Sequence, residues 1–422
     1  MGEFRFLTHD IAGIGGTFKS SPADFAVDEQ PLYAFSGTGE HTLVRIEKTG
    51  IATFEAVRRI GRALGVREDD IGTAGLKDAR ATTRQWVSIP RVDVAAVEQL
   101  ELRDVTVLEV TRHANKLRRG HLAGNAFVCV LRNVDPAGEQ RARDVLARLV
   151  ELGAPNHFGD QRFGSRADTH RLGRHLVRGD AEGLIRELLG GDDDDPDARE
   201  ARAAFEAGDL ATAQERMPMR RNQERRLLRT LIEAGDRDNR WTVAVKQLPN
   251  KLKKLYVSAY QSWLFNSLLD ARLPDLITLR TGDIAWLHRN GAAFEVTDAA
   301  TEQPRADAFE ISASGPLFGT KTLLATGEPG RDEQALLAAE QLTPDSFRIA
   351  GGLSQPGARR PYRFALRDAA LEWGVPAANE DAGDRAGAVH CTVRFALSAG
   401  CYATNVLGEL VKGDQPPLVP EA

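Results

Sequence analysis

The sequence contains only three cysteines, Cys129, Cys391 and Cys401, in 422 residues. Thiols so few and so scattered form neither a disulfide framework nor a cysteine-rich zinc site, and they are typical of a protein in reducing surroundings. No stretch approaches the roughly 18 to 20 uninterrupted apolar residues that a membrane helix requires. The first ten residues contain Arg5 and Asp10 and no apolar segment. We therefore expect no secretory signal, no membrane span and a cytoplasmic protein.

The motifs of several large enzyme classes are also missing. The nine histidines include no HExxH pair, and His170 and His175 lie five residues apart, off a common helix face. The glycines at 13, 15 and 16 lack the strand and helix that flank a dinucleotide fingerprint, and no phosphate-binding loop follows them. The residues therefore support neither a metal centre nor a thiol mechanism.

Neither sign of charge dominates, because 55 basic and 60 acidic residues give a net charge of −5. The basic residues are nevertheless clustered, at 112–119, 216–229 and 251–254. Such clusters in an acidic chain suit a protein that binds phosphates with one face. Each cluster taken alone fits a solvated helix face equally well, and the sequence does not say which one contacts a ligand.

Lysine is scarce, since only 10 of the 55 basic residues are lysines. Three of them, Lys19, Lys48 and Lys77, fall in the first 80 residues. A compact ammonium group is preferred over a guanidinium where a point charge must reach one carboxylate. The distribution is a compositional hint that this part of the chain holds such a contact.

Hydrophobic periodicity predicts alternating strands and helices in the first 165 residues. Strands are expected at 42–47, 87–89, 105–110 and 126–131. Thr53 is expected to cap a helix that Gly65 ends, with an apolar face made of Phe54, Val57, Ile60 and Leu64. Asp135 and Pro136 predict the start of a second helix, which Gly153 ends.

The middle of the chain, from about 184 to 361, is predicted to be rich in helices. There Tyr256, Tyr260 and Trp263 fall at helical spacing, and we interpret this stripe as core rather than as a base-stacking surface. A strand is expected at 389–397 and a helix at 403–411, and the tail after Gly413 is predicted to be disordered. Strand-rich ends around a helical middle indicate one domain inserted into another.

The segment from Gly72 to Trp86 is the most informative for chemistry. Two glycines in four residues imply a tight backbone, so that Lys77 and Asp78 fall at a turn before a strand. Positive charge from Lys77, Arg80 and Arg84 would hold the Asp78 carboxylate ionised, as a nucleophilic or basic aspartate requires. The alternative is that Asp78 caps the loop and the arginines face solvent.

A second segment, 156–164, combines two glycines, two aromatic residues, an amide and an arginine directly after a predicted helix end. Loops of this composition supply stacking faces and hydrogen-bond donors to a flipped base. The alternative is a packed connector whose phenylalanines fill the core, and taken alone the segment favours that interpretation.

Taken together, these segments resemble the TruD family of tRNA pseudouridine synthases. The matching motifs occur in order along nearly the whole chain, at 17–25, 39–50, 75–78, 113–127, 155–164 and 397–404. Only the helical middle is weakly matched, and its length is similar to that of the larger archaeal and eukaryotic members. Three positions depart from the family pattern: His157 stands where a tyrosine is common, Ser398 where proline is usual and Tyr402 where phenylalanine is expected.

The resemblance implies an α+β fold. A pseudouridine-synthase catalytic domain with a mixed sheet would comprise residues 1–182 and 362–422. A helix-rich α/β insertion particular to the family, the TRUD domain, would occupy 183–361 and face the catalytic domain across an RNA-binding cleft. We expect a monomer.

The resemblance also implies the site residues. Asp78 falls on the catalytic aspartate, and Lys19 on the lysine that pairs with it and keeps it ionised. The residues expected to line the uracil pocket are Phe25, Asn156, Phe158 and Tyr402. Among them Asn156 would brace the loop that carries Asp78, and Phe158 would stack on the target base.

The implied reaction converts a uridine of tRNA, expected to be uridine-13, to pseudouridine. The N-glycosidic bond breaks, the uracil rotates and its C5 bonds to the ribose C1′, with no redox change and no atom lost, so that no cofactor or metal is needed. The sequence does not decide whether Asp78 attacks the sugar, attacks the base or removes a sugar proton. The larger relatives also modify other positions, which leaves the target open.

Two other classes of function compete with this interpretation. The first is a non-catalytic tRNA-binding or tRNA-folding protein, but a pure binder has no need of the buried pair formed by Lys19 and Asp78. The second is an aspartate-dependent hydrolase, which would require a partnering histidine or a second carboxylate in a motif, and the sequence has neither.

Overall fold

The computed structural model describes residues 5–164, 167–191, 195–349, 352–374 and 388–413. Contacts group the chain into two compact units. The first, here called the sheet unit, comprises Arg5–Asn156 and Arg363–Pro416, and the second, the inserted unit, comprises His157–Tyr362. The second junction lies one residue from the limit predicted at 361 and 362, whereas the first lies well before 182. A compact unit need not coincide with a family domain, so the predicted domain limits stay a prediction.

The sheet unit is built around one eight-stranded sheet with the order β13-β14-β6-β1-β4-β2-β5, and β3 pairs with β4. Its strands are β1 (Phe25–Pro31), β2 (His41–Thr49), β3 (Gly72–Thr73), β4 (Thr82–Pro90), β5 (Val105–His113), β6 (Leu122–Val134), β13 (Arg367–Gly374) and β14 (Val389–Ser398). The pair β1 and β4 is parallel, and the other neighbouring pairs are antiparallel. The sheet is therefore mixed, which confirms the predicted fold class, and each predicted strand lies within an observed one.

The parallel pair matters for the site. Ala26 of β1 lies opposite Thr82 of β4, so the two strands begin at the same edge of the sheet. The segments that precede them, one containing Lys19 and the other Asp78, are therefore delivered to the same edge. Strand alternation within each segment carries no information about this pairing.

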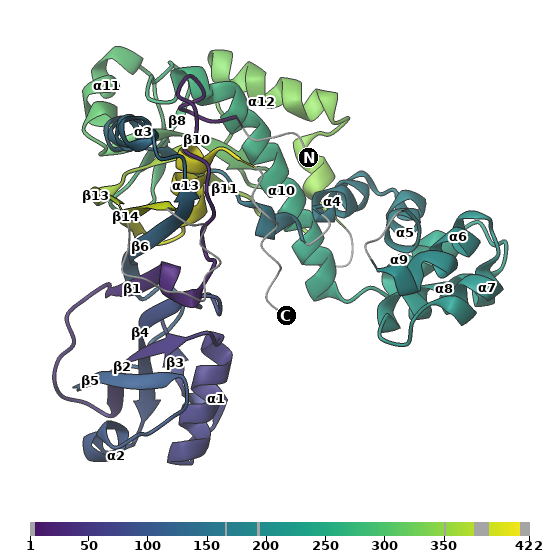
Figure 1. The fold of residues 1–422 in the computed structure, drawn as a ribbon. Helices are drawn as coiled ribbons and strands as arrows, with labels where there is room; N and C mark the ends of the chain where they lie inside the picture. The colour runs from purple at the N-terminus through teal and green to yellow at the C-terminus, as the bar shows by residue number, and fades with distance from the viewer. Residues whose placement is uncertain (1–4, 165–166, 192–194, 350–351, 375–387, 414–422) are drawn as a thin grey trace. The chain divides into compact units, whose positions relative to one another are not determined.

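The helices of the sheet unit are α1 (Thr53–Leu64), α2 (Val94–Glu98), α3 (Glu139–Leu152) and α13 (Ala403–Val411). Apolar residues of α3 and α13 pack with those of β1, β6 and β14 in one core, and α1 packs on β2 and β4 in another. Figure 1 shows α1 beside β2, β3 and β4. Helices thus cover the sheet both at the β14 and β6 end of the strand order and at the β4 and β2 end. Burial of these apolar side chains is the main force that stabilises the unit.

The predicted start of α1 was wrong in one respect. Ala52 precedes the helix as its cap residue, and Thr53 is its first helical residue and makes no cap hydrogen bond. Instead, Thr53 Oγ1 accepts a hydrogen bond from the backbone N–H of Lys77 at 2.9 Å. The hydroxyl group is thus used by the turn that carries Asp78 and not by its own helix.

The predicted apolar face of α1 was also partly wrong, because Phe54 is 63% exposed. Ala56 and Gly61 accompany Val57 and Ile60 on the buried side. At Gly61 the chain that leaves the helix turns back onto it, and a Cβ atom on Gly61 would meet the Val66 carbonyl oxygen at 2.7 Å. A pattern of large apolar residues therefore misplaced the buried face.

The helix predicted to start at Pro136, with Asp135 as its cap, begins three residues later, at Glu139. Asp135 Oδ1 accepts the backbone N–H of Ala137 at 3.0 Å, which closes a turn ahead of the helix. Aspartate forms such turns as readily as it caps helices, and the sequence alone does not distinguish the two. The predicted end at Gly153 is confirmed.

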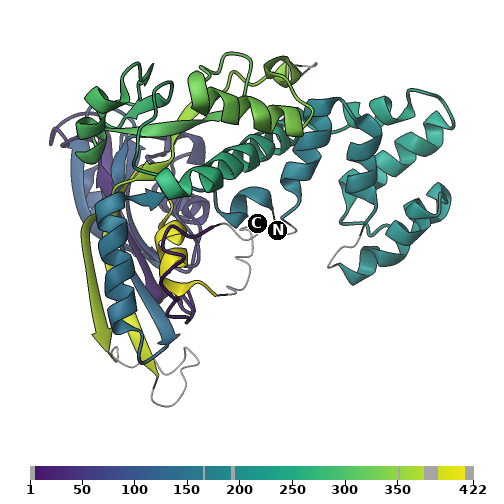
Figure 2. The same ribbon diagram turned by 90° about the horizontal axis from the view of Figure 1, so that it is seen from above.

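The inserted unit is mostly helical. Its helices are α4 (Thr169–Arg178), α5 (Ala181–Leu189), α6 (Arg199–Glu206), α7 (Leu210–Arg216), α8 (Asn222–Ala234), α9 (Arg240–Lys246), α10 (Asn250–Arg272), α11 (Ala299–Asp307) and α12 (Gly327–Ala339). A four-stranded sheet of order β11-β10-β8-β9 accompanies them, with β8 (Ile284–Leu287), β9 (Ala293–Glu295), β10 (Ile311–Leu317) and β11 (Ala358–Pro361). Figure 2 shows α5 to α9 gathered in a bundle.

The two tyrosines of the aromatic stripe of α10 lie in the core, as predicted, and Trp263 is partly buried. Tyr256 and Tyr260 are 7% and 0% exposed. The hydroxyl group of Tyr260 donates to Glu340 Oε2 at 2.7 Å, and Trp263 stacks on His170 with ring centroids 5.6 Å apart. Within the described ranges, no helix, α10 included, has the length and apolar character needed to cross a membrane.

A short strand pair holds the two ends of the insertion together. β7 (Ala154–Pro155), just before the chain leaves the sheet unit, pairs with β12 (Arg363–Phe364), just after the chain returns to it. The buried Arg363 donates to the Leu152 carbonyl oxygen at 2.8 Å. The predicted strand at 389–397 and helix at 403–411 correspond to β14 and α13, and the predicted disordered tail beyond 413 falls outside the described residues.

Candidate active site

Asp78 lies in an irregular turn between β3 and β4, at the sheet edge where β1 also begins. The backbone on the β3 side is close to its neighbours. A Cβ atom on Gly72 would lie 2.4 Å from the Leu117 carbonyl oxygen, so only glycine fits there. This crowding places the turn in one position relative to the sheet.

The side chains of Lys19 and Asp78 form an ion pair, with Lys19 Nζ 2.5 Å from Asp78 Oδ2. The Lys19 side chain is 6% exposed and that of Asp78 is 39% exposed. The Lys19 ammonium also lies 4.2 Å from the centroid of the Phe25 ring, which shields it from water on that side. A desolvated cation is thus directed at one carboxylate oxygen, and the rest of the carboxylate remains accessible.

Asp78 Oδ1 accepts no hydrogen bond from the described part of the chain, whereas Oδ2 is held by Lys19. The carboxylate therefore presents one engaged and one open oxygen. This is the arrangement required of a carboxylate that must stay ionised and still reach a substrate atom.

The segment containing Lys19 is held in place by Arg132 of β6. The backbones of Thr17 and Arg132 exchange two hydrogen bonds, of 2.9 and 2.8 Å. The Arg132 guanidinium donates to both carboxylate oxygens of Asp24, at 2.9 and 2.7 Å, and both side chains are buried. Lys19 itself adopts a left-handed backbone conformation with φ of 59°. Bidentate pairs of this kind add geometric specificity to their charge attraction, so the ammonium is aimed by its surroundings.

Two further lysines, Lys48 and Lys77, fix the turn that carries Asp78. Lys48 Nζ donates to the carbonyl oxygens of Asp78 at 2.9 Å and of Ile51 at 2.6 Å, and Lys48 is 1% exposed. The Lys77 ammonium pairs with the carboxylate of Glu29, and both side chains are buried. Glu29 Oε1 in turn accepts the backbone N–H of Trp86 in β4, at 3.2 Å. The turn is therefore tied to β1, β2 and β4.

This arrangement corrects the predicted source of positive charge around Asp78. Lys77 points to Glu29, and Arg84 pairs with Glu47 at 2.8 Å, so neither faces the Asp78 carboxylate. The pairing cation is Lys19, which is remote in sequence and was identified by resemblance alone. Residues next to one another in a turn or strand point in different directions, which is why sequence proximity failed here.

Sequence reasoning noted Lys48 only as one of a few early lysines and missed its role. A signal was present: Val44, Ile46 and Lys48 share one phase of β2, and all three are buried. A lysine on the inward face of a strand must find buried acceptors, because an unpaired buried charge is costly. The same logic applies to Glu29, which lies on the same buried face of β1 as Phe25 and Val27.

Two other predicted site residues lie in the same unit. Asn156 is 2% exposed and follows β7, and Tyr402 is 41% exposed and precedes α13. These two segments are joined, since Asn405 Nδ2 donates to the Pro155 carbonyl oxygen at 3.0 Å. Residues adjoining each segment pack in one hydrophobic core with Phe25 and with Ala81 of the Asp78 turn; they are Ala154 and Ala403. The predicted residues of the sheet unit therefore gather around one core.

Phe158 lies in the inserted unit and is 7% exposed. Its ring is covered by the guanidinium of Arg360, 4.2 Å from the ring centroid, and by the edge of Phe265, at 5.6 Å between centroids. Asn266 fixes the backbone by accepting from Phe158 N and donating to Phe158 O, each at 2.9 Å. The neighbouring His157 pairs with Asp270 at 2.9 Å. The aromatic face expected to stack on a base is thus occupied by an arginine in this structure.

No group of three or more histidine, cysteine, aspartate or glutamate side chains within the described ranges is arranged to hold a metal ion.

Comparisons with known proteins match this chain almost from end to end. A family model described as tRNA pseudouridine synthase D (TruD) matches residues 2–410. A protein named tRNA pseudouridine synthase D from Syntrophotalea carbinolica is 43% identical over 412 residues, which is 97% of this chain and 99% of the relative. A protein of the same name from Geobacter sulfurreducens is 45% identical over 413 residues, which is 97% of each chain.

The fold has a matching solved structure as well. The crystal structure of a Methanosarcina mazei protein assigned to tRNA pseudouridine synthase D superposes with a TM-score of 0.85 at 26% identity. It covers 97% of this chain, and this chain covers 96% of it. Relatives from bacterial and archaeal sources thus share the full length, including the long inserted middle.

Proposed function

Because the chain belongs to the tRNA pseudouridine synthase D (TruD) family, we propose that it isomerises a uridine of tRNA to pseudouridine with Asp78 as the catalytic carboxylate. The observation that supports this most directly is the pair of Lys19 and Asp78, in which one carboxylate oxygen is held at 2.5 Å. The other oxygen accepts no hydrogen bond from the described residues, and it belongs to a side chain that is 39% exposed. An RNA-binding protein without turnover gains nothing from such an arrangement.

The residues of this site have separate tasks in the proposed reaction. Asp78 Oδ1 meets the uridine, either bonding to it or taking a proton, while Lys19 holds Oδ2 and keeps the negative charge on the carboxylate. Breaking the N-glycosidic bond and bonding uracil C5 to the ribose C1′ conserves every atom of the substrate. The enzyme therefore supplies charge and position and no external reactant.

The uracil has to turn between the two bonds, and aromatic surroundings permit this. A ring face holds a base without the directional constraint of hydrogen bonds. In our proposal Phe25 and Tyr402 border the uracil, and Asn156 braces the turn of Asp78. Phe158 stacks on the base once the Arg360 guanidinium has moved off its ring.

Taking the uridine out of its stack costs a few kcal/mol, which contacts between basic residues and phosphates can offset. We propose that the target is uridine-13 of tRNA, that the enzyme acts as a monomer in the cytoplasm, and that it requires no metal ion or cofactor. The alternative function is a tRNA-binding or tRNA-folding protein, which would bind the same RNA without changing it.

The test incubates the purified protein with unmodified tRNA transcripts and maps pseudouridine by carbodiimide-dependent stops of reverse transcription. Asp78→Asn is the inactive variant. Asp28→Asn is its matched control, because Asp28 is 35% exposed and also ion-paired, with Arg45 at 2.7 Å. A stop at uridine-13 with the wild type and with Asp28→Asn, but not with Asp78→Asn, supports the proposal. Binding by the wild type without any stop favours the alternative.

A further inference from the structure

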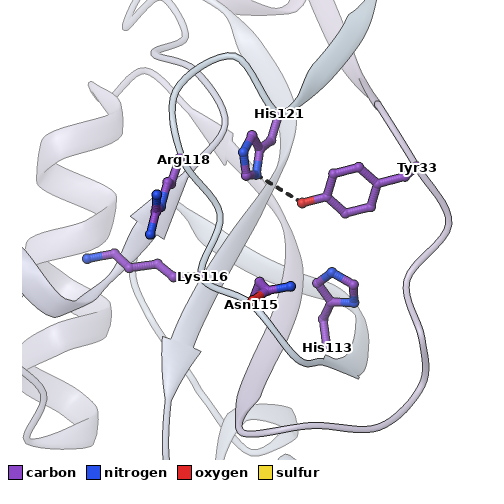
Figure 3. Close-up of a pocket in the computed structure, with 6 residues that line it drawn as sticks. All are labelled: Tyr33, His113, Asn115, Lys116, Arg118 and His121. Carbon is purple, nitrogen blue, oxygen red and sulfur yellow. Dashed lines mark hydrogen bonds between the residues drawn. The ribbon is translucent and has the colours of Figure 1, made fainter.

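A cavity of about 490 Å³ opens in the sheet unit, next to the site but formed by different residues. It is lined by Tyr33, His113, Asn115, Lys116, Arg118 and His121. Five of the six come from the end of β5 and the loop between β5 and β6, and Tyr33 follows β1 (Figure 3). The loop belongs to the basic cluster at 112–119, to which sequence analysis could assign no ligand.

One wall of the cavity is aromatic. The rings of Tyr33 and His113 lie 5.4 Å apart at 30° to one another, and His121 meets Tyr33 edge-on at 5.7 Å. The Tyr33 hydroxyl group and His121 Nδ1 share a hydrogen bond of 2.9 Å, drawn in Figure 3. Behind them, Phe35 packs on Trp86 with ring centroids 4.7 Å apart. The wall is therefore held rigidly and offers ring faces to a planar ligand.

The other side of the cavity offers open polar groups. Arg118 and Asn115 are exposed, and neither side chain makes a hydrogen bond or ion pair with another described residue. His113 Nδ1 accepts the backbone N–H of Ser36 at 3.3 Å, so in the neutral ring the proton lies on Nε2, which is a donor. The Lys116 ammonium donates to the Asp69 carbonyl oxygen at 2.6 Å, which engages one of its three N–H donors. The groups that can contact a ligand are thus one guanidinium, one ammonium, one amide and one imidazole N–H.

The cavity is joined to the turn of Asp78 through the backbone. Gly120 N donates to the Ala74 carbonyl oxygen at 2.9 Å, and Leu117 N donates to Ser88 Oγ at 2.9 Å. Ala74 is four residues before Asp78, so their Cα atoms are at most about 15 Å apart. A polynucleotide with its target uridine at Asp78 has neighbouring nucleotides within reach of this cavity.

We propose that the cavity binds a second nucleotide of the RNA substrate, one that flanks the uridine at Asp78. This inference rests on the proposed function and adds a specificity site to it. The base stacks on Tyr33 and His113, Asn115 contacts the edge of the base, and the guanidinium of Arg118 pairs with a phosphate. Aromatic faces beside a free cation and an amide are the groups by which proteins bind unstacked nucleotides. An inorganic anion would be bound by the cation alone and would not require the aromatic wall.

The first experiment places 2-aminopurine singly at the nucleotides that flank uridine-13 in a tRNA transcript, and measures its fluorescence at equilibrium with saturating protein. Stacking quenches this base. We expect one position at which Tyr33→Ala restores the fluorescence and Tyr33→Phe leaves it quenched, because phenylalanine keeps the ring face. Tyr33→Ala weakens tRNA binding by about 5- to 150-fold, the range for one lost base stack. If no flanking position responds to Tyr33→Ala, the proposal is overturned.

The second experiment compares two adjacent arginines. Arg118 lines the cavity and Arg119 does not, and both are exposed. Arg118→Ala should reduce the slope of log affinity against log salt by about 1, and Arg119→Ala should leave the slope unchanged. If both variants reduce the slope equally, the arginines act by diffuse charge attraction, which would contradict a specific phosphate contact by Arg118.

Pseudouridine formation is measured in parallel, which separates the two proposals. If the wild type forms pseudouridine and neither Tyr33→Ala nor Arg118→Ala changes KM or kcat, the proposed nucleotide site is overturned and the proposed reaction stands. If the quenching of 2-aminopurine fluorescence depends on Tyr33 but no tRNA is modified, the proposed reaction is overturned and the proposed nucleotide site stands.

Discussion

Lys48 Nζ lies 2.9 Å from the backbone carbonyl oxygen of Asp78, while Lys19 Nζ lies 2.5 Å from its carboxylate oxygen Oδ2. The Lys48 ammonium also holds the Ile51 carbonyl oxygen at 2.6 Å. Two lysines from distant parts of the chain thus act on one aspartate. Lys19 fixes the charge of its side chain, and Lys48 fixes the direction in which that side chain leaves the backbone.

Lys48→Met is therefore expected to lower kcat by about 10- to 100-fold without changing the affinity for tRNA, since small displacements of a reacting group have effects of this size. It should also cost about 1–3 kcal/mol of stability for each carbonyl left unpaired. Single-turnover kinetics and chemical denaturation measure the two effects. Arg45→Met is the control, because Arg45 lies on the same strand and pairs with Asp28 near the surface. An unchanged kcat in Lys48→Met would show that the turn holds its shape without the ammonium.

Lys19→Asn separates the charge of Lys19 from its backbone conformation. Lys19 has a φ of 59°, and asparagine tolerates this region better than most residues, so the turn should keep its path. We expect turnover to fall by about 100-fold or more through loss of the pairing charge, while the unfolding free energy changes by less than about 1 kcal/mol. Retained turnover with this variant would exclude a role for the ammonium in the reaction.

The strands were predictable from sequence because their signals are local: β2 alternates between polar and apolar residues, and β6 contains an apolar run rich in β-forming residues. The parallel pairing of β1 with β4 was not predictable in this way. It depends on contacts between segments more than fifty residues apart, and it is what brings Lys19 to Asp78. Resemblance to a family identified the pair, while the local sequence had pointed to Lys77, Arg80 and Arg84.

Local chemistry misled in two places for one reason. Thr53 and Asp135 both have side chains that cap helices, yet Thr53 bonds to Lys77 and Asp135 to Ala137. A short polar side chain bonds to whichever backbone group is near, and tertiary contacts decide which one that is. The cavity at Tyr33 was hidden similarly, because Tyr33 and the segment that carries His113 and His121 are separated by some eighty residues.

The buried pair of Lys77 and Glu29 predicts a strongly coupled double variant. Lys77→Met leaves the Glu29 carboxylate buried without its counter-charge, which should cost about 3–5 kcal/mol of stability. Adding Glu29→Gln removes the uncompensated charge and keeps an amide oxygen for the backbone N–H of Trp86, so the double variant should recover most of the loss. Urea denaturation of the two single variants and the double variant measures the coupling. Additive losses would show that the two side chains do not depend on each other.

The cysteines should differ sharply in reactivity. Burial raises the pKa of the Cys391 thiol to about 12, and burial likewise raises the pKa of Cys129 above its usual range. At about pH 8 almost none of either thiol is ionised, and the thiolate is the reactive form. Cys401 is only partly buried, so iodoacetamide followed by mass spectrometry should label Cys401 in the folded protein, and all three cysteines in denaturant.

The same two thiols predict how stability depends on alkaline pH. In the unfolded chain a thiol ionises near its ordinary pKa of about 8.5, whereas in the folded protein Cys391 holds its proton up to about 12. Above about pH 9 the unfolded state therefore binds fewer protons than the folded state, and stability must fall as the pH rises. Cys391→Ala and Cys129→Ala should flatten this fall relative to the wild type. Denaturation midpoints measured between about pH 8 and 10 provide the comparison. If the decline is as steep in both variants as in the wild type, other groups cause it.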